Sequence, residues 1–487
     1  MQYLSVRVVL TTLAAGTIAL AALSDVKYIV PGAEWLDTEG NFISNHAGAV
    51  VLNQQDGLWY WFGQDVVGDN TVFQGINIYS SPDLATWTHI GHAISRNDSI
   101  PELSAPAVVE RPKVVWNELE QQWRLWWHSD NQTYGLLKQA VATSPNITGP
   151  YTFLGSHSPL GDFSQDFGLF QDDDGKTYAM YSNGDSAVGR DNKIDLLNDQ
   201  FTDEAQTVYK FEDIDLEAPT ILRTKKKYYT IMSHKTGYRW NNVVYYSADK
   251  LEGPWSIGSY LAPAGTRTYN TQSGWNIRLK GSLQTTYIYV GDRWDPYDLE
   301  DSRYVWLPVV PNDATGALEM KWRDIWALDA KTGLWWEPKG TSYEAERGSV
   351  TGKARVAVAP TASGAKLVTG IAGSTSTLTI SGIRGTGELQ WVSFYYVNND
   401  DMGFGDSPGG SPDRIGGKFA LRRIATVSVN GGTPVLLKQP ITNEGIIQSV
   451  PLRITFNKGA NNTITIGGSA NSNGKDWAAD LDKLVVY

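Results

Sequence analysis

One glutamate in an apolar setting carries the strongest chemical signal in this sequence. Glu217 lies in the segment 212–221, between Leu216 and the pair Ala218-Pro219, with further apolar residues just beyond. Apolar neighbours disfavour the charged form of a carboxyl group, so they raise its pKa and allow it to donate a proton near neutral pH. Glu217 is therefore a candidate general acid. On these residues alone, an ordinary glutamate at the start of a strand remains the plainer interpretation.

A second carboxylate, Asp166, stands directly before the segment 167–176, which is typical of a strand, an acidic turn and a second strand. The acidic run 172–174 predicts a hairpin turn with solvated carboxylates rather than a site. An ionised carboxylate raises the pKa of a neighbouring carboxyl group. If Asp166 and Glu217 begin the innermost strands of neighbouring sheets around a central channel, their side chains lie close together.

The elements that must position these groups repeat along the chain. Short aromatic strands recur at intervals of roughly 50 to 65 residues, which is typical of propeller blades. They occupy residues 58–62, 123–127, 177–181, 228–232 and 286–290. Three of them are followed by a turn and a closing aromatic residue, at 80–87, 143–151 and 247–255. The repeats predict an all-β chain with a five-bladed propeller over residues 25–338, and a sandwich or double barrel is the competing architecture.

The composition changes after residue 340. Gly, Ser, Thr and Val dominate there, and strict alternation at 378–380, 426–429 and 463–466 is typical of short strands. Residues 341–487 are therefore predicted to form a β-sandwich, joined to the propeller through the linker 338–340. The segment 400–417 is predicted to be a long loop.

The overall composition excludes several partners. The 487-residue chain is 41% hydrophobic, carries a formal net charge of −11 and has no basic tract, which argues against nucleic acid and anionic membranes and favours a neutral ligand. Cysteine is absent, so disulfides and thiolate metal sites are excluded. Stability then depends on burial and on any bound metal, for which oxygen ligands are the natural choice.

The N-terminus is typical of a targeting segment. A short basic start, the apolar run 8–20 and the small-residue pattern 19–21 predict a signal peptide over residues 1–24, with a membrane anchor as the alternative. Secretion agrees with glycosylation acceptors at Asn97, Asn131, Asn146 and Asn461. We therefore expect a secreted, extracellular glycoprotein, and a monomer by default.

Several motifs together resemble glycoside hydrolase family 43, and in particular its fungal exo-β-1,3-galactanase branch. They lie at 46–49, 61–63, 109–113, 166–176, 216–219, 267–272, 291–294 and 302–304. The resemblance implies a five-bladed propeller that hydrolyses glycosides with inversion. It further implies Glu217 as general acid, Asp166 as the carboxylate that tunes and orients it, and Glu110 as a ligand of sugar hydroxyls.

The base position departs from the wider family. Inverting hydrolysis ordinarily uses a second carboxylate about 6.5 to 9.5 Å from the acid, and the family takes it from an aspartate early in the first blade. This chain has no aspartate within 45–48. In the galactanase branch a glutamine is found near the expected place, and Gln272 matches it. Gln272 is therefore expected to position the water or to act through its imidic tautomer.

Other pocket residues follow from the same resemblance. Gln64 stands where the branch often has glutamate, with Asp65 beside it, and is assigned to substrate binding. His46 is either a polar pocket residue or a structural histidine. Four aromatic residues near the motifs either stack on sugar faces or pack between blades, namely Trp240, Tyr269, Trp275 and Trp294.

The predicted sandwich resembles carbohydrate-binding module family 35. Carboxylates lie at its start and its end, where the first and last strands of a sandwich run side by side. The resemblance implies a structural Ca²⁺ held by Glu344, Glu346 and Asp482, with solvated strand ends as the alternative. It also implies a sugar-binding loop in which Trp477 stacks on the ring and Asp480 accepts from hydroxyls.

The function expected from these observations is a secreted, exo-acting, inverting glycoside hydrolase. It releases galactose from β-1,3-galactan, the backbone of arabinogalactan, and needs no cofactor for catalysis. The alternatives are a non-catalytic galactan-binding protein and a related arabinofuranosidase or xylosidase. The presence of both Asp166 and Glu217 favours an enzyme, because a pure binder needs no proton donor.

Overall fold

The computed structural model describes residues 27–68, 72–183, 190–296, 298–400, 422–443, 445–470 and 476–487. Nearly all regular secondary structure in these residues is β-strand, and the expected all-β class is confirmed. Within them, no helix is long and apolar enough to cross a membrane. The predicted signal peptide 1–24 and nearly all of the predicted loop 400–417 lie outside the described residues.

Five antiparallel sheets of four strands follow one another along the chain, each built from consecutive strands. The first contains β2 (Val50–Leu52), β3 (Trp59–Gln64), β4 (Gly75–Ser81) and β5 (Thr88–Ser95). The second contains β6 (Val108–Asn117), β7 (Gln122–Asp130), β8 (Lys138–Ser144) and β9 (Thr152–His157), and the third β10 (Phe167–Gln171), β11 (Thr177–Ser182), β12 (Asn192–Leu197) and β13 (Glu204–Phe211). The fourth contains β14 (Leu216–Arg223), β15 (Tyr228–His234), β16 (Val243–Ala248) and β17 (Ser259–Tyr260), and the fifth β18 (Gln272–Lys280), β19 (Thr285–Arg293), β20 (Arg303–Asn312) and β21 (Ala317–Met320).

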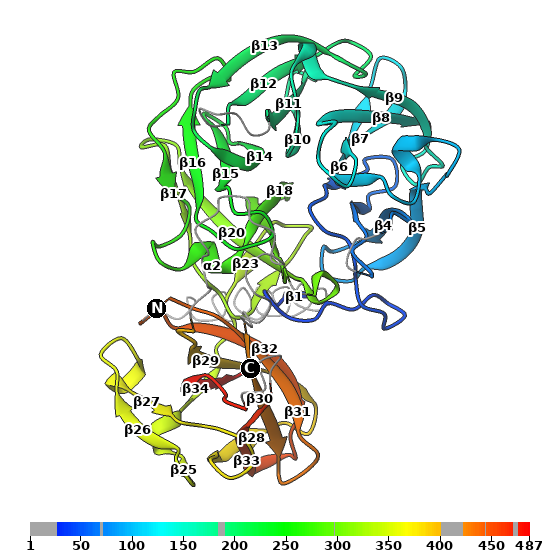
Figure 1. The fold of residues 1–487 in the computed structure, drawn as a ribbon. Coiled ribbons are helices and arrows are strands. Elements are labelled where there is room, and N and C mark those ends of the chain that lie inside the picture. Colours follow the sequence, from blue (N-terminus) through cyan, green and yellow to red (C-terminus); the bar gives the residue numbers. More distant parts are fainter. Residues whose placement is uncertain are drawn as a thin grey trace, which may run out of the picture.

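The five sheets are arranged in a ring, which Figure 1 shows from one end. Strand β6 contacts β3 and β10, β10 contacts β14, β14 contacts β18, and β18 contacts β2. The first strands of the sheets therefore face a common centre, while β5, β9, β13 and β17 lie at the outside. We call these five sheets the ring. The predicted aromatic strands are β3, β7, β11, β15 and β19, the second strand of each sheet.

Aromatic packing joins the first sheet to the fifth. The ring centroids of Trp61 and Trp306 lie 4.9 Å apart, and those of Trp61 and Trp87 lie 5.2 Å apart. All three side chains are fully buried. A small sheet adds to the closure, because β1 (Lys27–Ile29) pairs with β22 (Trp326–Leu328), which pairs with β23 (Trp335–Trp336). The two ends of the ring segment are thus held together by backbone hydrogen bonds and large apolar surfaces.

Residues 341–487, which we call the C-terminal region, form two further sheets. The strands of the six-stranded sheet are β24 (Thr341–Glu344), β26 (Arg355–Val358), β27 (Lys366–Thr369), β29 (Leu389–Val397), β32 (Gln448–Thr455) and β34 (Asp480–Val486). Those of the five-stranded sheet are β25 (Ser349–Val350), β28 (Leu378–Gly385), β30 (Arg422–Val429), β31 (Val435–Pro440) and β33 (Gly459–Ser469). One apolar core contains residues of both sheets. The first strand, β24, pairs with the last, β34, as expected.

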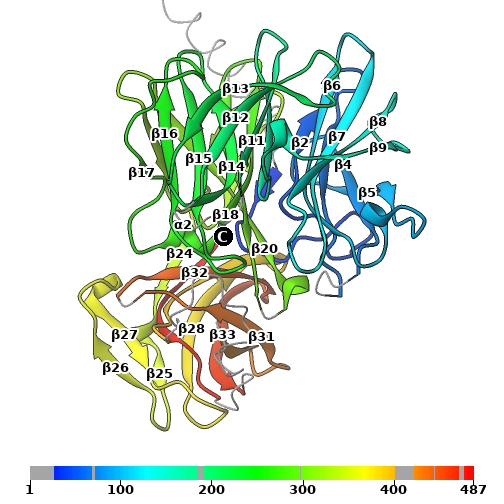
Figure 2. The same ribbon diagram turned by 45° about the horizontal axis from the view of Figure 1, so that its top comes forward.

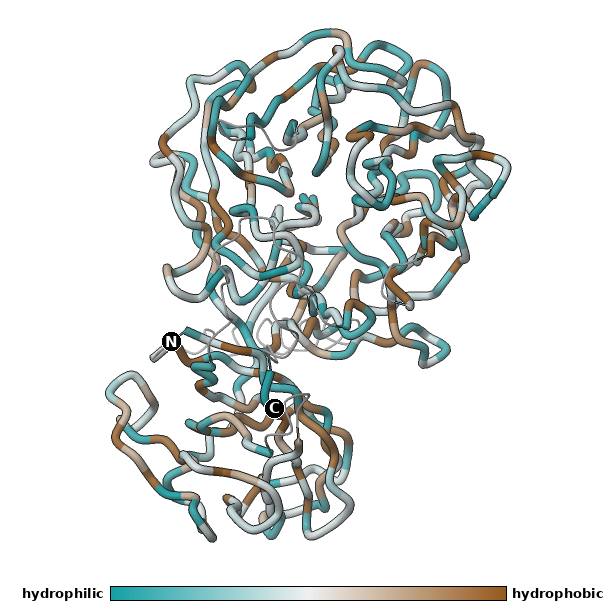
Figure 3. The backbone as a smooth tube through the Cα atoms, in the orientation of Figure 1, coloured by the Kyte–Doolittle hydropathy of each residue, from teal (hydrophilic) through white to brown (hydrophobic). Residues whose placement is uncertain are grey.

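The C-terminal region lies against the side of the ring where α2 (Arg267–Asn270) and β20 are found (Figures 1 and 2). Hydrophobic and hydrophilic residues are interspersed along both parts (Figure 3). Strands β3, β7, β11 and β15 are buried at nearly every position, as strands covered on both faces are.

Candidate active site

Four of the predicted site residues stand at the starts of first strands and meet at the centre of the ring. Asp166 precedes β10, Glu217 is the second residue of β14, Glu110 lies early in β6, and Gln272 begins β18. All four are buried. Residues more than 150 positions apart in the sequence therefore share one site, because the first strands of the sheets are neighbours around the centre of the ring.

Two equivalent β-bulges orient the side chains of Glu110 and Glu217. The strand pairing of β6 slips between Glu110 and Lys113, and that of β14 slips between Glu217 and Thr220. In each bulge the residue after the glutamate has a positive φ, 52° at Arg111 and 55° at Ala218, and a proline follows. Because proline cannot donate to the ladder, the strand breaks its pairing there and turns the glutamate side chain out of the regular alternation.

Glu217 is the buried acid of the site. The residue as a whole is 4% exposed. One of its carboxyl oxygens, Oε2, accepts a hydrogen bond from Arg190 at 3.1 Å. The other, Oε1, accepts from Gln272 Nε2 at 2.9 Å. Burial, followed by the negative charge of Asp166, raises the pKa of Glu217 to about 8, although Arg190 and Arg111 act in the opposite direction. Glu217 can therefore donate a proton at neutral pH.

Asp166 is the ionised partner of this acid. Its Oδ1 forms an ion pair with Arg111 Nε at 2.9 Å, and its Oδ2 accepts from the backbone N–H of Ala218 at 2.8 Å. Burial alone would raise the pKa of Asp166, but the guanidinium groups of Arg111 and Arg190 outweigh it and hold the pKa below its usual value. The two carboxyl groups thus have pKa values pushed apart, the pattern that separates an acid from a charged stabiliser.

A glycine allows the close approach of the two strands. A Cβ atom on Gly168, in β10, would lie 2.3 Å from the carbonyl oxygen of Pro219, in β14. Real Cβ atoms do not tolerate this distance, so a larger residue would push the strands apart. Gly168 therefore permits the spacing at which Asp166 reaches the backbone of Ala218.

The amide of Gln272 is held in one orientation. Its Oε1 accepts from Arg111 at 2.6 Å and from the indole Nε1 of Trp294 at 2.9 Å, and both groups can only donate. Its Nε2 therefore points to Glu217. This direct contact is much shorter than the roughly 6.5 to 9.5 Å that separates acid and base across a sugar and a water. The hydrogen bond between Gln272 and Glu217 must open before a substrate can lie between them.

Glu110 and Gln64 lie at the edge of this group. Glu110 Oε1 accepts from the hydroxyls of Tyr134 at 2.7 Å and Tyr238 at 3.1 Å. Gln64 Oε1 accepts from the backbone N–H of Arg111 at 3.4 Å, whereas its buried Nε2 has no protein acceptor. An unpaired buried amide is costly, so this Nε2 is a natural donor to a ligand hydroxyl.

Two arginines of the site were not predicted to act. Arg111 lies within the motif at 109–113, but its contacts with both Asp166 and Gln272 are seen only in the structure. Arg190 precedes β12 and belongs to no motif, yet it pairs with Glu217. The glutamate–arginine–proline string at 110–112, parallel to the glutamate–alanine–proline string at 217–219, is the one sequence signal that pointed to Arg111.

Several other candidates are held by contacts within the protein. Both ring nitrogens of His46 are engaged, Nδ1 by Asp292 at 2.9 Å and Nε2 by the hydroxyl of Tyr304 at 3.1 Å. Asp65 accepts from Ser44 Oγ at 2.7 Å. The aromatic residues near the motifs pack within the protein, since Trp240, Tyr269 and Trp294 are buried and Trp275 is half-buried.

The three predicted metal ligands lie around the turn at Ser363 and Gly364 in the C-terminal region, where a Cβ atom on Gly364 would lie 2.7 Å from Glu346 Oε1. Glu344 Oε1 accepts from Ser363 Oγ at 2.9 Å, and Asp482 Oδ1 accepts from the Ser363 N–H at 2.8 Å. Glu344 Oε2 and Glu346 Oε2 are buried without a protein partner. Burial, with the charges of Glu344 and Glu346 adding to it, raises the pKa of Asp482 to about 6. Clustered carboxylates with orphaned oxygens fit a hard cation such as Ca²⁺.

The predicted sugar-binding residues, Trp477 and Asp480, lie just before and at the start of β34. The side chain of Trp477 is 49% exposed, and residue 477 forms an isolated bridge with Ala372. Asp480 begins β34 and is half-buried, with its pKa raised by burial. The charges of Arg423 and Arg355 oppose this rise.

A buried acid with a raised pKa, an ionised carboxylate beside it and an oriented amide at the centre of a β-sheet ring define a glycoside hydrolase. The family model described as glycosyl hydrolases family 43 matches residues 45–260. Crystal structures of an exo-β-1,3-galactanase from Phanerochaete chrysosporium, one with galactose and one of a variant with β-1,3-galactotriose, are similar to this chain. Each is 35% identical to this chain and has a TM-score of 0.83 against it. The match covers 95% of this chain and 100% of the galactanase chain. This chain belongs to glycosyl hydrolases family 43.

Two proteins of lower identity are also similar to this chain. An exo-β-1,3-galactanase from Clostridium thermocellum shares the fold, with a TM-score of 0.59 and 24% identity over 93% of this chain and 99% of that chain. A xylan 1,3-β-xylosidase of Vibrio sp is 26% identical over 203 residues. That match covers 38% of this chain and only 36% of the Vibrio enzyme.

Proposed function

We propose that this chain is an exo-acting, inverting glycoside hydrolase that releases galactose from the β-1,3-galactan backbone of arabinogalactan. The observation that carries the proposal is the buried acid Glu217, set between Asp166, Arg190 and Gln272. The likeness to the Phanerochaete exo-β-1,3-galactanase, over the full length of that chain, supports the choice of substrate.

The site supports the following reaction. Substrate entry opens the hydrogen bond between Gln272 and Glu217, and Glu217 then donates its proton to the glycosidic oxygen as the bond to the anomeric carbon breaks. A water attacks that carbon from the opposite face, and its proton passes to the surrounding solvent, or to Gln272 if the imidic tautomer operates, which completes the inverted sugar. Gln272, held by Arg111 and Trp294, positions this water. It can accept the proton through its imidic tautomer only if Arg111 and Trp294 first release Oε1, because both groups can only donate. Asp166 keeps Glu217 protonated, and Glu110 and Gln64 bind sugar hydroxyls.

Two other functions are tested by the same experiment. A non-catalytic galactan-binding protein would need no acid with a raised pKa, whereas Glu217 has one. The Vibrio relative is a xylosidase, which keeps a xyloside or an arabinofuranoside as the alternative substrate. Purified protein is incubated with β-1,3-galactan, arabinan and xylan, and free monosaccharides are measured. Galactose from galactan is expected, and pentose without galactose would overturn the proposal.

The architecture and location of the protein belong to the same proposal. The closed ring of strand contacts supports a five-bladed propeller over residues 25–338, and the two sheets that share one core support a β-sandwich carbohydrate-binding module over 341–487. In this module Trp477 and Asp480 would hold the polysaccharide. We further propose a secreted, monomeric glycoprotein; three of its four acceptor asparagines are exposed, Asn97, Asn146 and Asn461.

We also propose that Glu344, Glu346 and Asp482 hold a structural Ca²⁺. Calcium is then expected to raise the melting temperature, because an ion that binds only the folded state stabilises it. The rise should grow as the pH increases through about 6, where Asp482 ionises. Differential scanning calorimetry with Ca²⁺ or with a chelator measures it. Glu346→Gln should abolish the rise, and Glu388→Gln, at an exposed position of the same region, should not.

Substituting Asp166 with asparagine is expected to move the alkaline limb of activity to lower pH. Removal of the negative charge takes away an interaction that raises the pKa of Glu217 and leaves Arg111 without its ion-pair partner, and both changes lower that pKa. The neutral sugar does not titrate in this range, so initial rates on β-1,3-galactotriose between pH 5 and pH 10 report the protein. An unmoved limb would show that Asp166 does not tune the acid.

A further inference from the structure

The turn α2, directly before Gln272, has a left-handed backbone. Its four residues, Arg267–Asn270, have φ values of 50°, 50°, 59° and 59°, and none of them is glycine. L-amino acids avoid this conformation because the Cβ atom approaches the following carbonyl oxygen. A run of four such residues is therefore held by its surroundings rather than by its own sequence. We call Arg267–Asn270 the left-handed turn.

The C-terminal region supplies part of this support. Asn270 is completely buried, and its Nδ2 donates to the carbonyl of Ile441 and to Gln448 Oε1, both at 3.0 Å. Gln448 Nε2 donates in return to the carbonyl of Thr266 at 3.3 Å. The last side chain of the left-handed turn and the backbone carbonyl just before the turn are thus both bound by residues that begin or precede β32.

A second residue of the same connection between β31 and β32 reaches the start of the turn. Asn443 Nδ2 donates to the carbonyl of Gly265, and Asn443 Oδ1 accepts from the guanidinium of Arg267. Two amide side chains, Asn443 and Gln448, therefore fasten the segment that leads to the oriented amide Gln272.

The C-terminal region also supports the other side of Gln272. Trp294, which donates to Gln272 Oε1, has its own carbonyl bound by the indole Nε1 of Trp240 at 2.6 Å. Trp240 packs against Ile441, and both side chains are buried. Ile441 therefore makes two contacts: its carbonyl accepts from Asn270, and its side chain packs against Trp240, which supports Trp294.

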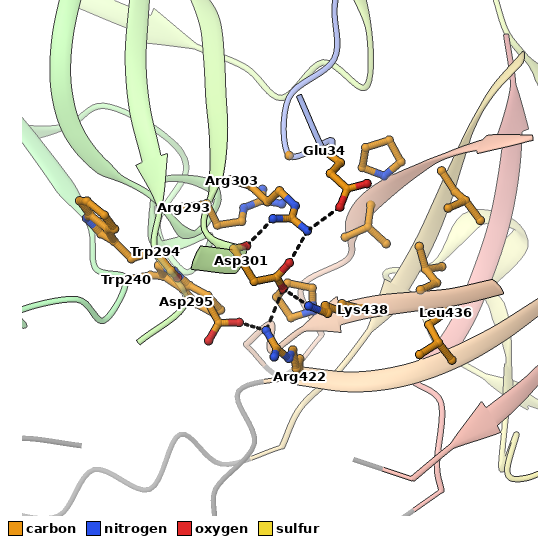
Figure 4. A pocket seen from close by; sticks show the side chains of 16 residues that line it. Glu34, Trp240, Arg293, Trp294, Asp295, Asp301, Arg303, Arg422, Leu436 and Lys438 are labelled. Carbon is orange, nitrogen blue, oxygen red and sulfur yellow. Dashed lines mark hydrogen bonds and ion pairs between the residues drawn. The ribbon is translucent and has the colours of Figure 1, made fainter. Parts of the chain in front are cut away.

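Charged contacts hold the segment after Trp294 against the same surface. Asp295 and Asp301 form ion pairs with Arg422, and Asp301 also pairs with Lys438, as Figure 4 shows. Asp298 pairs with Arg422 as well, at 3.3 Å. Arg422 and Lys438 lie in strands β30 and β31 of the C-terminal region, so both segments that contact Gln272 are anchored outside the ring.

We propose that the C-terminal region positions the catalytic amide, and that Asn270, Asn443 and Gln448 are positioning residues for Gln272. The region then contributes to turnover itself and not only to retention on the polymer. This inference rests on the proposed function of Gln272. It follows that loosening this contact lowers turnover on a soluble trisaccharide, for which attachment to an insoluble polymer offers no advantage.

The test compares Gln448→Ala with the wild type on β-1,3-galactotriose, using the full chain. We expect kcat to fall about tenfold with KM within twofold, because a small displacement of a reacting group costs rate rather than binding. The alkaline limb of kcat should move to higher pH, since Glu217 loses a donor that favours its charged form. Gln448→Glu keeps the acceptor for Asn270 and should restore part of the rate. Asn443→Ala provides a second, milder variant.

A matched control separates positioning from loss of stability. Asn462→Ala removes a buried amide that binds the carbonyls of Ile383 and Asn457 within the C-terminal region, away from the turn. At a temperature where all variants are folded, it should leave kcat unchanged. Equal loss in Asn462→Ala, or unchanged kcat in both Gln448→Ala and Asn443→Ala, would overturn the inference.

A second measurement does not depend on activity. Hydrogen exchange of peptides that span 265–275 should be faster in Gln448→Ala than in the wild type, and unchanged in Asn462→Ala. If the wild type released no galactose from the trisaccharide, the proposed function would fail. Faster exchange in Gln448→Ala would still support the inference that the C-terminal region holds the left-handed turn in place. Unchanged exchange in Gln448→Ala would overturn that inference, whatever the substrate of the enzyme is.

Discussion

Replacing Glu217 with glutamine is expected to lower kcat on β-1,3-galactotriose by about 10³-fold, within the range that a general acid contributes. Glutamine keeps the size of the side chain but cannot donate the proton that the leaving oxygen needs. In the wild type, kcat should fall above pH 8, because the pKa of Glu217 is raised to about 8 and only the protonated form acts. The residual rate of the variant should lack this alkaline limb.

The matched control for this variant is Glu212→Gln, five residues earlier in the same segment. Glu212 is exposed and pairs loosely with Lys210 at 3.7 Å. The same chemical change there should leave both kcat and the pH profile unchanged. Galactose release by Glu217→Gln at the wild-type rate, from a protein with a native circular dichroism spectrum, would place the acid elsewhere.

Replacing Gln272 with alanine is expected to lower kcat by about 10²-fold, with a smaller change in KM. The substitution removes the group that faces the attacking water and leaves Arg111 and Trp294 without their shared acceptor. It also removes a hydrogen bond to Glu217 Oε1, so the pKa of the acid should rise further and the alkaline limb should move upward.

Gln171→Ala is the comparison for Gln272→Ala. Gln171 is an exposed glutamine at the end of β10 that donates to backbone carbonyls. It tests the loss of an amide of equal size far from the centre of the ring, and turnover should not change. Undiminished turnover in Gln272→Ala would mean that neither water positioning nor the imidic tautomer operates at this residue.

The sequence was sufficient where the signal is local. The aromatic strands 58–62 and 123–127 are predicted from residue type alone, because aromatic side chains favour strands and both segments are short apolar runs. Glu217 was found because the apolar residues that raise its pKa are partly its own chain neighbours. The pairing of β24 with β34 agrees with the expectation that the first and last strands of a sandwich run side by side.

Only the tertiary structure decided which groups meet at the acid. Arg190 carries no motif, and it reaches Glu217 because the third and fourth sheets lie side by side. The direct contact of Gln272 with Glu217, and the left-handed turn held by Asn443 and Gln448, join segments far apart in the chain. Their geometry depends on how the sheets and the C-terminal region pack, and local propensity does not encode that packing.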